Sequence, residues 1–158
     1  MTTPLPELKQ PAALPQELRA CTAFLLAKVG FGMKLSAIEE FERVGYSLYQ
    51  FSVLAVLAEG AKETQATIAD ALGLDRSQLV GVLDTLEERE LIERRRDPND
   101  RRRHTVTLTA AGKRELVKMR EILKRVEDRF LAPLDEESRR VLHDTLLRVA
   151  ASFDQRYC

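Results

Sequence analysis

The residues of this chain best suited to chemistry are six arginines that flank a turn at residues 97–100. They are Arg94, Arg95 and Arg96 before the turn and Arg101, Arg102 and Arg103 after it. Guanidinium groups bind phosphate oxygens bidentately and fit the narrow minor groove of DNA. Residues 94–114 contain eight cationic and two anionic side chains, a local net charge of +6, although the whole chain carries 25 of each sign. This charge predicts a polyanionic partner, but a solvated charged loop explains the same composition equally well.

A β-hairpin is the element that would position these arginines. Residues 105–109 alternate Thr and apolar residues as a strand does, and Leu91 and Ile92 lead into its partner. Between them Pro98 fixes φ, and the neighbouring Asp and Asn side chains can bond backbone N–H groups in the turn. The pattern predicts a hairpin with a basic tip.

Two short helices are predicted immediately before the hairpin. Thr64 is an N-cap for a helix over 65–72, and Gly73 is placed to end it in the left-handed conformation. Asp75 is an N-cap for a second helix over 76–89. Two helices joined by so tight a turn form a helix-turn-helix. Two such helices followed by a hairpin predict a winged helix. This favours DNA binding over the interpretation of the basic segment as a solvated charged loop.

The second of these helices is expected to read DNA. Its predicted buried stripe is Leu79, Val82, Leu83 and Leu86. A recognition helix inserts its N-terminal residues into the major groove. The expected contacts from this helix are Arg76, Ser77, Gln78 and Gly81, with Thr64 and Gln65 from the preceding helix.

Long helices are predicted at both ends of the chain. The first runs from near Pro15 to about residue 43, with Gly30 and Gly32 as the points where it bends or divides; further helices cover 47–58, 110–131 and the stretch to about 155. Their apolar faces exceed what a small lobe can cover, so we expect them to pair across a two-fold axis. The expected division is a flexible Pro-rich arm (1–14), an N-terminal dimerisation region (15–46), a winged helix-turn-helix lobe (47–109) and C-terminal dimerisation helices (110–158). The fold class is mostly α with a small β-hairpin wing.

The composition argues against several other classes of protein. The longest uncharged run, residues 45–58, is too short to span a bilayer, and residues 1–15 lack the apolar core of a signal peptide. We therefore expect a cytoplasmic protein that does not contact membranes. The two cysteines, at positions 21 and 158, have no metal-ligand spacing. With no paired carboxylates, phosphate loop or nucleophile–base set, the chain is expected to be neither an enzyme nor a cofactor or metal protein.

Three sequence segments carry a resemblance to a known family. They are the LE at 86–87, the LIERRRDPNDRR at 91–102 and the LTAAG at 108–112. With them, residues 64–112 resemble the DNA-binding lobe of the MarR family of bacterial transcriptional regulators. The resemblance implies that Arg102 enters the minor groove and that Asp100 holds wing and recognition helix together through ion pairs. The resemblance also implies a homodimer that binds a pseudo-palindromic site in double-stranded DNA. It further implies a repressor that a small-molecule effector, bound between the dimer helices and the lobes, releases from DNA.

The chain departs from that family pattern at several positions. Val80 and Gly81 replace a hydroxyl and a basic residue, Thr85 stands where a basic residue is common, and Glu90 stands where the family usually has Gly. Gly81 costs roughly 1 kcal/mol of helix propensity relative to Ala. Either glycine arose here by neutral drift, or it is present because it permits close approach of the helix to DNA. Residues 59–93 contain nine acidic and three basic side chains. We therefore expect the wing to supply most of the attraction to phosphate, although a winged helix that binds protein remains an alternative.

Cys21 supports a further alternative. By resemblance to the organic-hydroperoxide regulators, a cysteine in the first helix could sense oxidants. A reactive thiol needs a stabilised thiolate, and Cys21 falls on the apolar stripe of Leu18 and Leu25. A core cysteine is therefore the preferred interpretation, with a redox switch as the alternative.

Overall fold

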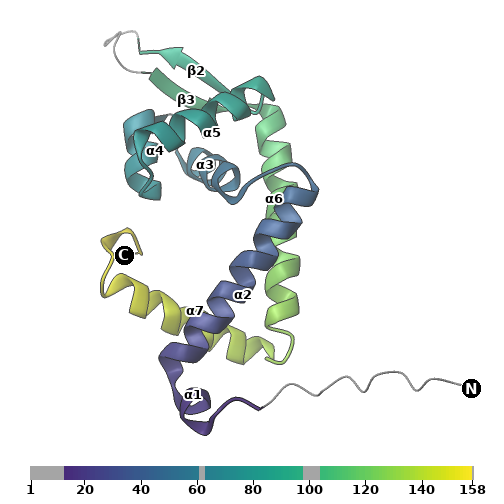
Figure 1. The fold of residues 1–158 in the computed structure, drawn as a ribbon. Helices are drawn as coiled ribbons and strands as arrows, with labels where there is room; N and C mark the ends of the chain where they lie inside the picture. The colour runs from purple at the N-terminus through teal and green to yellow at the C-terminus, as the bar shows by residue number, and fades with distance from the viewer. Residues whose placement is uncertain (1–12, 61–62, 98–103, 158) are drawn as a thin grey trace, which may run out of the picture.

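The computed structural model describes residues 13–60, 63–97 and 104–157, and it is mostly helical (Figure 1). In chain order the elements are α1 (Gln16–Ala20), α2 (Thr22–Arg43), α3 (Leu48–Glu59), β1 (Glu63–Thr64), α4 (Gln65–Leu72), α5 (Arg76–Glu88), β2 (Ile92–Arg96), β3 (His104–Leu108), α6 (Ala110–Phe130), α7 (Glu136–Ala151) and the 3₁₀ turn η1 (Gln155–Tyr157). In the described part of the chain, no helix combines the length and the apolar character that crossing a membrane requires.

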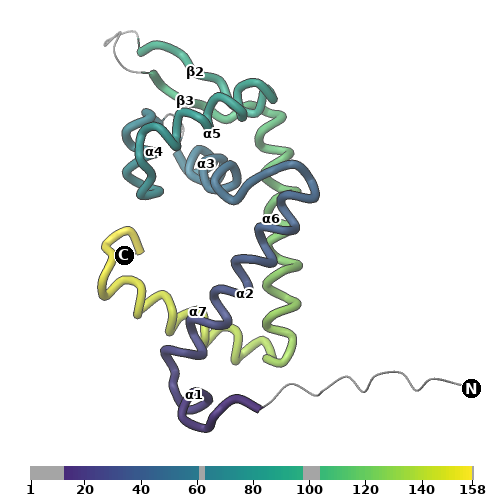
Figure 2. Tube along the Cα trace, in the orientation of Figure 1, coloured from purple at the N-terminus to yellow at the C-terminus, as the bar shows by residue number. Residues whose placement is uncertain are grey.

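Helices α3 to α5 and the hairpin form one lobe, and α2 and α6 extend from it side by side (Figures 1 and 2). The hairpin is antiparallel, with Ile92 opposite Leu108 and Arg96 opposite His104. A two-residue strand, β1, pairs with the other side of β3, so the strand order is β1-β3-β2. The hairpin agrees with the prediction, whereas β1 was not expected because two residues carry no alternation.

Local capping explains why the helix-turn-helix forms where the sequence predicts it. The Thr64 hydroxyl accepts a hydrogen bond from the Thr67 N–H at 3.1 Å, and Asp75 accepts one from the Gln78 N–H at 2.8 Å. Gly73 ends α4 with φ of 62°, the left-handed conformation that a residue without Cβ adopts most easily. These bonds satisfy amides that would otherwise lack partners at each helix start.

The core lies inside the lobe and continues into α6. Its largest fully buried aliphatic side chains include Leu54, Ile68, Leu79, Leu83, Leu86, Ile92, Leu116 and Met119. Burial of one such side chain stabilises a fold by roughly 1.5–3 kcal/mol. The predicted stripe of the recognition helix is therefore confirmed, with Val82 only partly buried at its margin.

The first long helix divides at a different residue from the one predicted. Cys21, with φ −87° and ψ 106°, separates α1 from α2, whereas Gly30 and Gly32 lie inside an uninterrupted α2. A Cβ on Gly32 would lie 3.2 Å from the ring of Phe130 in α6. Gly32 therefore permits close packing of α2 on α6, and the helix continues through both glycines.

Cys21 is exposed in the single chain, so the interpretation of it as a core cysteine is wrong for the protomer. It lies at the α1–α2 junction, and α1 has no buried residue that could enclose it. The last helix also differs from the prediction, because α7 ends at Ala151 and is followed by η1.

Candidate nucleic-acid interface

The N-terminal turns of α5 present the residues expected to contact bases. Arg76, Ser77, Gln78 and Gly81 are all exposed. The Ser77 hydroxyl donates to Asp75 Oδ1 at 2.5 Å, and this bond, with the Gln78 amide, holds the pKa of Asp75 below its usual value. A Cβ built on Gly81 meets open space, so no packing within the described chain requires glycine there.

A surface pocket brings three elements of the predicted interface together. It has a volume of about 490 Å³ and is lined by Thr64 and Gln65 at the start of α4, by Arg76 of α5 and by His104 of β3. With Thr67, five hydrogen-bonding or cationic side chains therefore line one pocket between the helix-turn-helix and the wing strand β3, beside the apolar Ala66, Leu79 and Val80. The sequence does not indicate that His104 lines the same pocket as Arg76, because this depends on the pairing of β3 with β1 beside the start of α4.

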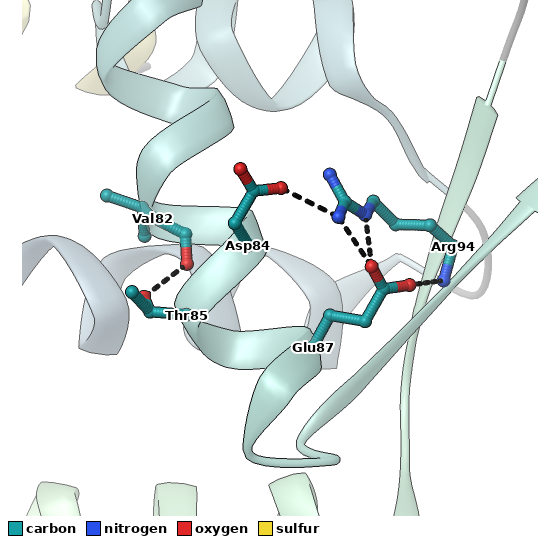
Figure 3. A network of polar contacts seen from close by, with 5 residues as sticks. All are labelled: Val82, Asp84, Thr85, Glu87 and Arg94. Carbon is teal, nitrogen blue, oxygen red and sulfur yellow. Dashed lines mark hydrogen bonds and ion pairs between the residues drawn. The ribbon is translucent and has the colours of Figure 1, made fainter.

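Arg94 is turned toward the recognition helix (Figure 3). Its Nε donates to Glu87 Oε2 at 2.8 Å, and its Nη2 lies 2.7 Å from Asp84 Oδ1. The side chain is 21% exposed. The bond from Arg94 holds the pKa of Glu87 below its usual value, and the same pairing raises the pKa of Arg94.

Strand alternation explains why Arg94 and Arg95 differ. Side chains two residues apart share one face of a strand, so Arg94 lies on the face of the buried Ile92. Arg95 lies on the other face, where it is 77% exposed and pairs with Glu93 at 2.8 Å. Exposed pairs of this kind contribute little to stability, so Arg95 can exchange its partner for a phosphate.

The remaining wing residues of the prediction lie outside the described residues. They are Asp100, Arg101, Arg102 and Arg103, and their roles stay predictions. The family resemblance assigns an ion-paired link between wing and recognition helix to Asp100. Among the described residues, Arg94 makes such a link with Asp84 and Glu87. Sequence reasoning missed it, and the signal was the acidic pair Asp84 and Glu87, one helical turn apart on α5.

Many of the acidic side chains around the recognition helix are occupied. Asp84 and Glu87 bind Arg94, Glu93 binds Arg95, and Asp75 caps α5. Glu63 accepts a hydrogen bond from the Thr67 hydroxyl at 2.6 Å. Arg94 and Arg95 therefore offset part of the negative charge of residues 59–93 within the lobe, which weakens the argument against a polyanionic partner.

A helix-turn-helix whose second helix packs on a following antiparallel hairpin defines the winged-helix class of domain. The model of the MarR family matches residues 47–104. A putative transcriptional regulatory protein for the hcr operon of Thauera aromatica is 29% identical over 133 residues, 79% of this chain and 80% of that protein. The chain belongs to the MarR family of transcriptional regulators.

Solved structures agree over almost the whole described fold. CouR from Rhodococcus jostii RHA1 bound to p-coumaroyl-CoA is 31% identical, has a TM-score of 0.70 and is matched over 86% of this chain and 96% of that chain. The transcriptional repressor CouR bound to a 23-mer DNA duplex is also 31% identical, with a TM-score of 0.76 over 88% of this chain and 99% of that chain. The similarity therefore extends beyond the lobe to the long helices.

Proposed function

We propose that this protein is a homodimeric repressor that binds a pseudo-palindromic DNA site and is released from it by a small molecule. The observation that carries the proposal is the convergence of Thr64, Gln65, Arg76 and His104 on one pocket beside the exposed start of α5. Groups from a helix-turn-helix and its wing that meet in this way suit a groove edge and its flanking phosphates. CouR, which shares this fold, has been solved bound to a 23-mer DNA duplex, and this supports DNA as the partner.

The long helices support a dimer. Large apolar side chains on α2, on α7 and just beyond the end of α7 are exposed in the single chain, among them Leu25, Phe31, Leu147 and Phe153. α7 contains no buried residue, so little apolar packing within the protomer holds it in place, and a second surface would supply that packing. Two copies joined there would set two recognition helices about one DNA turn, roughly 34 Å, apart.

The test is a titration of a labelled duplex, taken from the DNA upstream of the protein's own gene, at several salt concentrations. We expect specific binding that weakens as salt rises, because phosphate contacts release counterions. Arg76→Ala and Arg102→Ala should each weaken it by about 1–3 kcal/mol. Unchanged affinity for Arg102→Ala would remove the wing from the interface, and the absence of any salt-sensitive binding would favour a protein partner.

The effector would bind between the dimer helices and the DNA-binding lobes. CouR binds p-coumaroyl-CoA, so this thioester and free aromatic acids are suitable first probes for release of DNA. We assign no catalytic role, and we place the protein with the chromosome in the cytoplasm because a repressor acts there.

Oxidation of Cys21 is the second candidate input. Its exposure makes the thiol accessible in the protomer. If it is the sensor, hydrogen peroxide should release DNA from the wild type but not from Cys21→Ser. Equal release from both proteins would exclude this thiol as the switch.

A further inference from the structure

We propose that Arg94 is a positioning residue of the DNA-binding surface: it holds the wing at a fixed orientation to the recognition helix and pairs with two carboxylates there. This inference rests on the proposed function and deepens it. The rival interpretation is that Arg94 contacts DNA itself, as the arginine run in the sequence suggests.

The contacts join β2 to α5 through both backbone and side chain (Figure 3). The Arg94 N–H donates to Glu87 Oε1 at 3.2 Å, while the guanidinium binds Glu87 Oε2 and Asp84. β2 is an edge strand of the described sheet, and an edge amide without a strand partner needs another acceptor. Glu87 therefore accepts a hydrogen bond from the backbone amide of Arg94 and also holds the Arg94 side chain.

This geometry restrains rotation of the wing. A carboxylate that receives bonds from a backbone N–H and a guanidinium fixes both the strand and its side chain. Arg96 lies two residues closer to the hairpin tip, about 7 Å farther along the strand. A small rotation at Arg94 therefore becomes a larger displacement at the arginines that follow it.

The same contacts change the electrostatics of α5. Asp84 and Glu87 are 49% and 39% exposed, so both would repel a nearby phosphate if they were unpaired. One arginine offsets one of the two negative charges and draws both carboxylates toward β2. The acidic recognition helix and the DNA-binding wing are compatible because Arg94 lies between them.

The decisive variant is Glu87→Ala in the full chain, with Glu88→Ala as its matched control. Both remove one carboxylate from α5 and exchange Glu for Ala, but only Glu87 holds Arg94. If Arg94 is a positioning residue, Glu87→Ala weakens binding of the upstream duplex by about fivefold or more, although it removes a negative charge. Glu88→Ala leaves binding unchanged or slightly tighter.

A double-mutant cycle separates the two interpretations further. We expect Arg94→Ala to weaken binding, and the double variant Arg94→Ala/Glu87→Ala to bind no worse than Arg94→Ala alone, because both changes break one contact. Tighter binding by Glu87→Ala, additive losses in the cycle, or an equal loss for Glu88→Ala would each overturn the proposal.

Amide hydrogen exchange supplies a readout that needs no DNA. Glu87→Ala should accelerate exchange at the Arg94 amide and along β2 and β3, while amides of α6 keep their wild-type protection. Unchanged exchange in the hairpin would overturn the positioning role whatever the DNA affinities are. Failure of the wild type to bind DNA would instead refute the proposed function and leave this exchange test valid.

Discussion

Gly112 lies in the first turn of α6, where the helix passes the base of the wing. A Cβ at this position would lie 2.1 Å from the Leu91 carbonyl oxygen and 2.7 Å from Leu108 Cδ1. The nearer neighbour is backbone, so it cannot move as a flexible side chain would. Gly112→Ala must therefore push α6 away from residue 91.

The expected cost follows from the contacts that this displacement disturbs. Overpacking costs about 1–3 kcal/mol. The Leu91 oxygen also accepts hydrogen bonds from the Thr109 N–H at 3.1 Å and the Thr109 hydroxyl at 3.0 Å, and each weakened bond costs about 1 kcal/mol. Better helix propensity of Ala returns about 1 kcal/mol. We expect Gly112→Ala to lower the free energy of unfolding by about 2–4 kcal/mol.

The assay is urea unfolding followed by circular dichroism at one fixed protein concentration, since dimerisation makes stability depend on concentration. Gly81→Ala is the matched control, because its Cβ meets open space. This control should raise stability by up to about 1 kcal/mol. If Gly112→Ala were as stable as Gly81→Ala, the steric argument at the base of the wing would be refuted.

Three further predictions concern stability and assembly. Glu90 has φ of 57°, so Glu90→Gly should relieve left-handed strain and raise the urea midpoint by an amount equivalent to about 1 kcal/mol; a lower midpoint would contradict this. Lys124 and Arg139 hold the pKa of Asp128 below its usual value, as Arg94 does for Glu87. Both carboxyls bind fewer protons in the folded state, so their stabilisation is present above about pH 4 and is lost as the pH falls through the folded pKa values; a urea midpoint equal at pH 6 and pH 3 would refute it. Leu147→Asp on α7 and Phe153→Asp just beyond its end place charges at exposed apolar positions and should shift sedimentation from dimer to monomer; an unchanged dimer would move the interface elsewhere.

Local chemistry explains the parts of the fold that sequence reasoning predicted well. The caps at Thr64 and Asp75 and the left-handed Gly73 depend on residues within one helical turn, so they can be recognised without knowing the fold. The stripe on α5 follows from helical periodicity in the same way. By contrast, β1 depends on its pairing with β3, and the close contact at Gly32 of α2 depends on Phe130 of α6, partners that lie far away in sequence.

The same distinction between local and long-range information applies to the candidate site. From the sequence alone, the protein is a winged helix with a basic wing, a recognition helix that begins at Arg76 and a resemblance to the MarR family, because motifs and short-range spacing carry this information. Only the tertiary structure decided which wing arginine faces inward and how the acidic helix is neutralised. Strand alternation separates Arg94 from Arg95, but it does not say which face meets a helix. Packing of β2 against α5 answers that, because an ion pair forms only where folding brings distant charges within a few ångströms.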